Sequence, residues 1–492
     1  MAKPSGGARR STLSSGLLTA ISFAVITGLS AAVGVVIARE FGRGAQTDGF
    51  FAAYGVFLVL VLAASAIRVA VLPALARARA DGVFGSVLGG YALAVGLVSL
   101  VALAVGVGAN EWTAEALTGG LPEEARGTAA DALVFLVPAA VAHLFAALAA
   151  SGLAAFDSYG TAAAGYALGS VLGLALIVWR VDEDGIVACA WGTLANGAVA
   201  LAIPLAALFV RADWGRRTAF AVRSRLAELA RAAALPIALQ ALFVVCLRFA
   251  SDLGTGAVTT FTYAYFVAAA LVAVTASSLG MVSSVPLTRA SLSDERASRH
   301  VVSTSLVSFA AVATAAGVFA LVGDRIVRAA LGSAYEGEAG GEIGRLVGLL
   351  GPWMAASIGV TITFPMLFVA GRERRLPLLA VAVLALHVVV AWAAVDAFDL
   401  DGAALALTIS TLAVLVALLA LLSARVLAVS GRGLALGAVA VGALALLAFG
   451  LPAVLLPDAA AAVLGVGVFG ALLVAARDLG LRQAWGYLRT LD

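Results

Sequence analysis

The chain has 492 residues, of which 63% are hydrophobic and only 12% are charged, and its formal net charge is +3. A soluble globular chain carries about 25% charged residues, because polar surface must cover its core. The composition therefore excludes a soluble fold and predicts an all-α polytopic membrane protein, whose runs of about 20 apolar residues cross a hydrocarbon layer of about 30 Å. The arginines are scattered over short loops, so we expect contact with lipid headgroups and no nucleic-acid partner.

Loop signals divide the chain into about fourteen expected membrane spans. The first run is too long for the apolar part of a signal peptide, so it is interpreted as a span. The expected spans are residues 12–38, 49–75, 85–107, 129–151, 161–179, 186–210, 233–252, 257–287, 300–322, 345–370, 376–396, 402–424, 434–456 and 459–477.

The basic residues favour one orientation of these spans. With the N-terminus inside and loops assigned alternately, 22 Lys and Arg residues fall inside and 7 fall outside. Cytoplasmic loops are enriched in Lys and Arg, so the bias predicts that both termini are cytoplasmic.

The two halves of the chain share landmarks that indicate duplication. At offsets of 213, 214 and 217 residues, the pairs are Pro73 with Pro286, Pro138 with Pro352, and Gly185 with Gly402. Six spans per half is an even number, so the sequence predicts two parallel-related six-helix lobes plus two C-terminal helices. The expected divisions are an N-lobe at 1–210, a cytoplasmic amphipathic linker at 211–232, a C-lobe at 233–424, and two last spans with a cytoplasmic C-terminus at 425–492.

The chain lacks the common enzyme and metal motifs. It contains no G-x-x-x-x-G-K-[ST], H-E-x-x-H or C-x-x-C sequence, and its three histidines, His143, His300 and His387, are far apart. Cys189 and Cys246 lie in apolar runs, which is typical of small core residues. We therefore expect no enzymatic activity, no cofactor and no metal.

Two arginines fall inside the expected spans. Arg68 either reaches the interface and pairs there or faces a cavity. Arg248 and Asp252 are four residues apart on one helix face, so they form either a local ion pair or part of a binding surface. Facing a cavity, both arginines could hold an anionic headgroup such as a pyrophosphate. The other cavity candidates are Thr27, Ser30, Phe51, Tyr54, Gln240 and Tyr265.

Polar and small residues also punctuate the chain. The stretch FGRGAQTDGFFAAY at residues 41–54 reads as a tight outer hairpin, where Gly42 and Gly44 permit the reversal and Asp48 caps the second helix. Pro73 and Pro286 are expected to have structural or gating roles. Gly165, Gly169 and Gly173 form a G-x-x-x-G-x-x-x-G ridge that predicts close helix packing in the bundle or a homodimer contact.

The pattern ARxFGxGxxTDxFFxAY, followed by a second span ending in VLPALA, resembles the lipid II flippase (MurJ) family, of the multidrug/oligosaccharidyl-lipid/polysaccharide exporter superfamily. Segments of the second half, such as ASDLGTGAVTTFTYAY and SSLGMVSSVPLTRASL, are also similar to it. The residues that carry the resemblance are Ala38, Arg39, Phe41, Gly42, Gly44, Thr47, Asp48, Phe50, Phe51, Leu72, Pro73 and Leu75.

The resemblance implies a flippase of the bacterial plasma (inner) membrane, which moves the peptidoglycan precursor lipid II between leaflets by alternating access of two lobes. The family has a cationic cavity. This chain has Thr27 and Val33 where the family has first-span arginines, and Arg68 where no family arginine is expected. With no ATP-binding motif, an ion gradient or the membrane potential would supply the energy.

Two alternatives remain open. One is an exporter of another polyprenyl-linked saccharide or of an amphiphilic metabolite. The other is a non-transporting scaffold that recruits cell-envelope synthesis proteins through its basic loop at 211–231. The expected partners are a lipid-linked glycan and the bilayer, and we expect a monomer.

Overall fold

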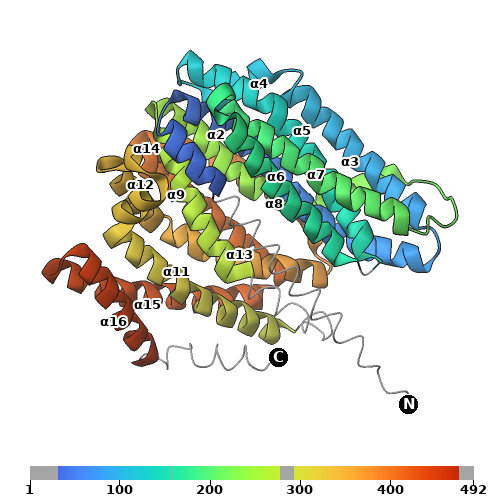
Figure 1. Cartoon of the computed structure of the whole chain (residues 1–492). Helices are drawn as coiled ribbons and strands as arrows, with labels where there is room; N and C mark the ends of the chain where they lie inside the picture. Colours follow the sequence, from blue (N-terminus) through green and yellow to red (C-terminus); the bar gives the residue numbers. More distant parts are fainter. Residues whose placement is uncertain (1–31, 157, 278–292, 476–492) are drawn as a thin grey trace. The chain divides into compact units, whose positions relative to one another are not determined.

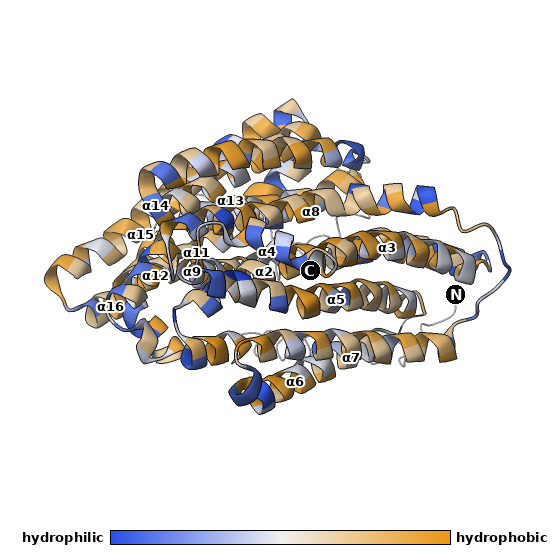
Figure 2. Cartoon of the chain, turned by 90° about the horizontal axis from the view of Figure 1, so that it is seen from above, coloured by the Kyte–Doolittle hydropathy of each residue, from blue (hydrophilic) through white to orange (hydrophobic). Residues whose placement is uncertain are grey.

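The computed structural model describes residues 32–156, 158–277 and 293–475, and every regular element in these ranges is helical. Twelve helices there are long and apolar enough to cross a membrane. In Figure 2 long apolar stretches alternate with hydrophilic residues at helix ends and connections. The expected all-helical membrane protein is confirmed.

The chain divides into two compact units, residues 1–244 with 254–256, and residues 245–253 with 257–492. The helices of the first unit, shown in blue to green in Figure 1, follow a helical stretch at 32–41. They are α2 (Ala45–Ala80), α3 (Phe84–Gly106), α4 (Asn110–Thr118), α5 (Glu123–Ala154), α6 (Tyr159–Asp184), α7 (Val187–Arg211) and most of α8 (Val222–Ala250).

Helix α5 is the centre of the first unit, in contact with α2, α3, α4, α6 and α7. Residues on all faces of α5 are buried, and many of them are alanines. Small side chains let neighbouring backbones approach closely in lipid, where apolar surface alone does not drive association. The same principle explains the ridge on α6. A Cβ at Gly169 would lie 2.6 Å from the Asn196 carbonyl oxygen, and one at Gly173 would lie 2.6 Å from that of Gly192, so this ridge packs against α7.

The second unit contains the end of α8 and the elements that follow it. These are η1 (Ser251–Leu253), α9 (Ala257–Val272), η2 (Ala273–Ser277), α11 (Asp294–Leu331), η3 (Ser333–Tyr335), α12 (Glu338–Leu349), α13 (Gly351–Val369), η4 (Glu373–Arg375), α14 (Leu376–Leu422), α15 (Ala424–Leu455) and α16 (Asp458–Ala475). Helix α11 is the main packing element, in contact with α9, α12, α13, α15 and α16.

The observed helices differ from the expected spans at one boundary in the second unit. The span expected at 345–370 is divided at Leu350, because Pro352 occupies the first turn of α13 and favours a helix start there. The break expected between the spans at 376–396 and 402–424 is confirmed, because α14 leaves helical φ/ψ angles at Phe398 and Asp399. His387 before the break lies 2.8 Å from Ser410 after it, whereas one continuous helix would hold them about 34 Å apart. The first expected span lies mostly outside the described residues.

The amphipathic linker is also different from the expected surface helix. Residues 212–221 are not helical, and residues from Val222 onward are the first turns of α8. The extended part follows the start of α3, where the backbone N–H of Gly85 donates to the Trp214 carbonyl at 2.9 Å and that of Arg216 donates to the Gly82 carbonyl at 2.7 Å. The Arg225 guanidinium lies 4.9 Å from the Tyr91 ring centroid. This segment therefore packs on protein.

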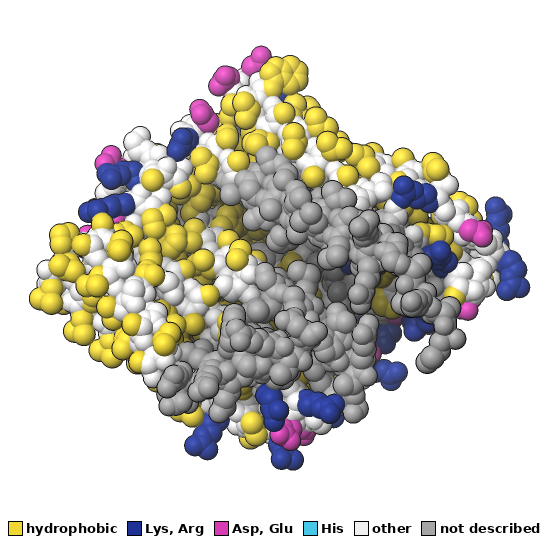
Figure 3. All heavy atoms as spheres, turned by 60° about the horizontal axis from the view of Figure 1, so that its bottom comes forward, with side chains coloured by type: hydrophobic (Ala, Val, Ile, Leu, Met, Phe, Trp, Pro, Cys, Tyr) yellow, Lys and Arg dark blue, Asp and Glu magenta, His cyan; other side chains and the backbone are white. Residues whose placement is uncertain are grey.

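Many large hydrophobic side chains of the described residues are exposed. On the face in Figure 3, hydrophobic side chains cover broad areas, and most charged side chains gather in groups toward the edges of the view. This distribution is the one that a hydrocarbon layer with polar boundaries requires.

Candidate functional site

The joint between the helical stretch at 32–41 and α2 is tied to a distant peptide of the first unit. The backbone N–H of Gly256 donates to the Asp48 carboxylate, and Arg43 Nε donates to the Gly256 carbonyl at 3.1 Å. Asp48 is completely buried. Arg43 and Asp48 thus bind the carbonyl and the N–H of Gly256. Arg43 and Gly256 are 213 residues apart in sequence, which equals one of the repeat offsets.

The capping role expected for Asp48 is wrong. Helix α2 begins at Ala45, its N-cap is Gly44, and Asp48 lies one turn inside with its side chain turned to Gly256. Gly42 has φ +62°, a left-handed conformation that favours glycine. Gly44 has an extended φ of −160° and open space around it, so only the first glycine is needed for the reversal.

Aromatic rings extend from this joint along α2. Phe50 and Phe51 are buried, with centroids 5.8 Å apart. Tyr54 stacks on Phe50 at 5.8 Å and on Phe57 at 5.1 Å. Two sequence candidates, Phe51 and Tyr54, therefore belong to one aromatic row.

The row continues onto α5 and α6 and reaches Arg68. The His143 ring lies 5.9 Å from Phe57 and stacks on Tyr166 at 6.0 Å. The Arg68 guanidinium carbon lies 5.0 Å from the Tyr166 centroid, in cation–π geometry. Arg68 is exposed, and in the described part of the chain no carboxylate pairs with it. We call Tyr54, Phe57, His143, Tyr166 and Arg68 the aromatic ladder.

The ladder leaves a positive charge on a preorganised apolar support, which suits an anionic group joined to a ring or chain. The sequence analysis found Arg68 and Tyr54 but missed Phe57 and Tyr166. The (i, i+3) spacing of Tyr54 and Phe57 was the available signal.

The remaining candidates of the first unit are less informative. Gln240 is half-buried in α8, and Pro73 is exposed within α2, which continues to Ala80. Thr27, Ser30 and Pro286 lie outside the described residues.

In the second unit, Arg248 and Asp252 form an ion pair of 2.7 Å at the end of α8, with side chains 39% and 48% exposed. Tyr265 of α9 is buried, and its ring centroid lies 5.1 Å from that of Trp353. The Arg248–Asp252 ion pair therefore lies at the surface of this unit, whereas Tyr265 packs inside it.

A buried polar network in the second unit joins three segments. His387 Nδ1 lies 2.8 Å from Ser410 Oγ, and its Nε2 lies 3.5 Å from Cys246 Sγ. The Cys246 thiol also donates to the Ala403 carbonyl at 3.6 Å. The network links α8 to both halves of kinked α14. Sequence reasoning considered Cys246 and His387 separately and missed Ser410.

An apolar cavity of about 660 Å³ lies between α11, α13 and α15 of the second unit. Its lining includes Phe309, Val312, Pro352, Val441 and Phe449. A cavity with this lining suits a hydrocarbon chain rather than a sugar.

The family profile described as "Lipid II flippase MurJ" matches residues 37–473. The chain belongs to the lipid II flippase MurJ family. It is thus a multi-pass membrane protein of a transporter family and not an enzyme, and no group of three His, Cys, Asp or Glu in the described ranges could hold a metal ion.

Solved structures share the fold of this MurJ family member. "Lipid II flippase MurJ, inward closed conformation" is similar with a TM-score of 0.69 and 14% identity, over 94% of this chain and 99% of that one. A MOP superfamily transporter from Pyrococcus furiosus has a TM-score of 0.55 and 15% identity, over 87% and 94%. A MATE structure "in the straight conformation" has a TM-score of 0.56 and 17% identity, over 87% and 94%. No curated protein sequence matches the chain.

Proposed function

We propose that this protein translocates a lipid-linked glycan precursor across the bacterial plasma membrane, with lipid II as the substrate. The main support is the family match over residues 37–473. The substrate class requires an apolar site for a polyprenyl chain and a cationic site for a pyrophosphate, and each unit supplies one of these chemistries.

In the first unit, Arg68 supplies the charge. An arginine at a membrane depth is costly unless it is paired or solvated, and the Tyr166 ring stabilises it without neutralising it. The guanidinium therefore keeps its donors for phosphate oxygens, to which it binds in bidentate geometry.

In the second unit, the cavity between α11, α13 and α15 supplies the apolar site. Gly317 lets the Phe449 ring pack against α11 at the cavity wall, since a Cβ there would lie 2.4 Å from the ring. A polyprenyl segment here would gain about 25 cal/mol for each Å² that it buries.

We also propose that both termini are cytoplasmic, that the substrate moves from the inner to the outer leaflet, and that an ion gradient or the membrane potential drives the movement. Arg68 is the residue for which we propose a contact with the substrate phosphates, whereas the charge of Arg248 is already paired with Asp252 at 2.7 Å.

The test is translocation of fluorescent lipid II in proteoliposomes. We expect transport by the wild type, at least a tenfold loss in Arg68→Ala, and an intermediate loss in Tyr166→Leu, whereas Tyr166→Phe keeps the ring and the activity. Arg180→Ala is the matched control, because Arg180 is paired with Asp184 at 2.7 Å at the end of α6.

Absence of wild-type transport, together with failure to rescue a flippase-depleted strain, would overturn lipid II as the substrate. Transport of another polyprenyl-linked saccharide would then identify the exporter alternative. Full activity of Arg68→Ala would overturn only the role of Arg68.

A further inference from the structure

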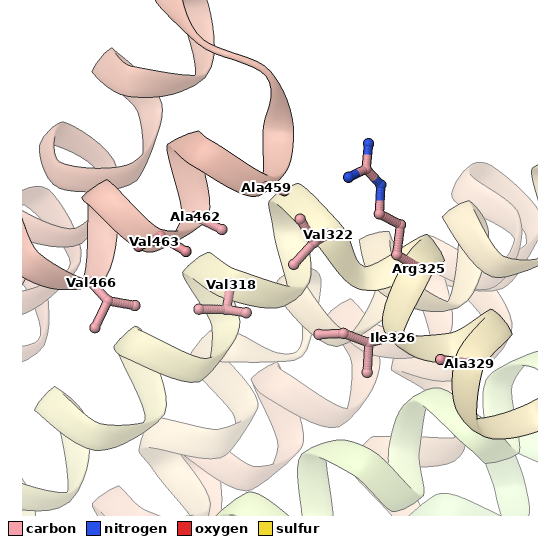
Figure 4. A pocket seen from close by; sticks show the side chains of 9 residues that line it. All are labelled: Val318, Val322, Arg325, Ile326, Ala329, Ala459, Ala462, Val463 and Val466. Atoms are coloured by element: carbon pink, nitrogen blue, oxygen red, sulfur yellow. The ribbon is translucent and has the colours of Figure 1, made fainter.

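A second apolar groove lies between α11 and α16 in the second unit, with a volume of about 410 Å³. In Figure 4, Val463 and Val466 of α16 face Val318 of α11 across it. Ala462 is buried at its floor, whereas Val463 is 77% exposed. Eight of the nine lining residues are apolar, and Arg325 is the exception.

The groove begins at helix ends. Arg325 lies near the end of α11 at Leu331, and Ala459 is the second residue of α16. Val466 lies about 11 Å farther along α16 than Ala459, at 1.5 Å per residue. The end of the groove at Arg325 therefore lies where α11 and α16 reach the boundary between the hydrocarbon layer and the lipid headgroups. The apolar part of the groove extends into the hydrocarbon layer.

Arg325 is an exposed cation with no described acidic partner. Two other arginines of this unit have one: Arg328 pairs with Glu336 at 2.8 Å, and Arg345 pairs with Asp401. Figure 4 shows the Arg325 guanidinium extending away from the apolar side chains at the rim of the groove.

The groove differs from the cavity that we propose for the polyprenyl chain. That cavity contacts Phe309, Val312 and Ala316 on α11, which repeat at helical spacing on one face. The groove contacts Val318 and Val322 on another face of α11. Residues two positions apart in a helix, such as Ala316 and Val318, point about 200° away from each other. Two lipid chains can therefore occupy α11 at once.

We propose that this groove is a binding site for an anionic phospholipid of the surrounding bilayer. The Arg325 guanidinium binds the headgroup phosphate, and one acyl chain fills the groove between α11 and α16. At about 30 Å³ for each water-sized group, the volume holds on the order of a dozen methylene groups. An anionic headgroup matches the unpaired charge, whereas a zwitterionic headgroup brings a competing cation of its own.

The test measures binding of lipids to the purified, detergent-solubilised full chain by native mass spectrometry and thermal shift. The probes are dioleoylphosphatidylglycerol, dioleoylphosphatidylcholine and inorganic phosphate. We expect phosphatidylglycerol to bind the wild type at least fivefold more tightly than phosphatidylcholine, and inorganic phosphate to have no effect on thermal stability.

Two variants test the two parts of the site. Arg325→Gln should lose the preference for phosphatidylglycerol, whereas Arg328→Gln, with the same change in net charge, should keep it. Val463→Trp should obstruct the groove and weaken binding of both lipids, whereas Val454→Trp, at a residue that is 83% exposed on α15 and outside the groove, should not.

Equal preference in Arg325→Gln and Arg328→Gln would overturn the site, because binding would then follow net charge alone. Stabilisation by inorganic phosphate equal to that by phosphatidylglycerol would overturn the lipid as ligand. None of these readouts requires transport, so they are independent of the proposed flippase function.

Discussion

Replacement of Asp48 by alanine tests the tie between the joint at 41–54 and Gly256. The substitution removes a buried carboxylate that accepts the Gly256 N–H. A hydrogen bond to a charged group contributes about 1.5–3 kcal/mol, whereas hydrogen bonds between transmembrane helices average about 0.6 kcal/mol. Because Asp48 is charged and has no exposed surface, the larger range applies.

We therefore expect Asp48→Ala to lower the free energy of unfolding by about 2 kcal/mol, which is roughly thirtyfold in the opening equilibrium. For a unit of about 250 residues this corresponds to a decrease of about 4–8 °C in Tm. Asp48→Asn, which keeps an acceptor oxygen, should lose about half as much.

The assay is thermal unfolding of the purified protein in detergent, followed by circular dichroism. Glu124→Ala is the control, since Glu124 accepts an exposed hydrogen bond from Gln46 at 2.9 Å. A double-mutant cycle with Arg43→Gln should show less than additive losses, because both side chains hold Gly256. Equal Tm values for Asp48→Ala and Glu124→Ala would refute the reasoning.

Three further substitutions have defined outcomes. Gly169→Val places a side chain 2.6 Å from the Asn196 carbonyl oxygen, so we expect a loss of about 1–3 kcal/mol, seen as a lower Tm and less folded protein on size-exclusion chromatography. Ser410→Ala removes the partner of His387 Nδ1 and should cost about 0.6–1.7 kcal/mol by thermal unfolding. Gly42→Ala must adopt φ +62° and should cost about 1–2 kcal/mol by the same measurement.

Matched variants separate these effects from general fragility. Gly44→Ala should be neutral, because open space surrounds that glycine and its φ is extended. Gly341→Ala should also be neutral, since a Cβ there meets nothing within 4 Å. Losses in these two controls as large as those in Gly42→Ala or Gly169→Val would contradict the packing argument.

The class of protein could be predicted from sequence because the mean hydropathy of each span depends only on its own consecutive residues. A run such as 129–151 is apolar wherever it packs, and its length alone matches the bilayer. The signature at residues 38–75 likewise indicated the family, since it combines short-range turn chemistry with fixed residues. Boundaries were less accurate: the span expected at 345–370 is divided at Leu350, where Pro352 in the first turn of α13 favours a helix start.

The candidate site was found only in part, because its members come from separate helices. Arg68 was recognised as a charge inside an apolar run, but only folding brings it to Tyr166, about a hundred residues away, and places His143 between two aromatic rings. Asp48 was recognised in a turn, yet its partner is the peptide of Gly256 and not its own helix.

Membrane insertion and family could therefore be derived from the order of residues, since both depend on local hydropathy, charge and turn chemistry. The partners of the buried polar groups depended on the tertiary structure. A polar group removed from water binds whichever donor or acceptor the packed helices bring within about 3 Å, and the distance along the chain does not limit that choice.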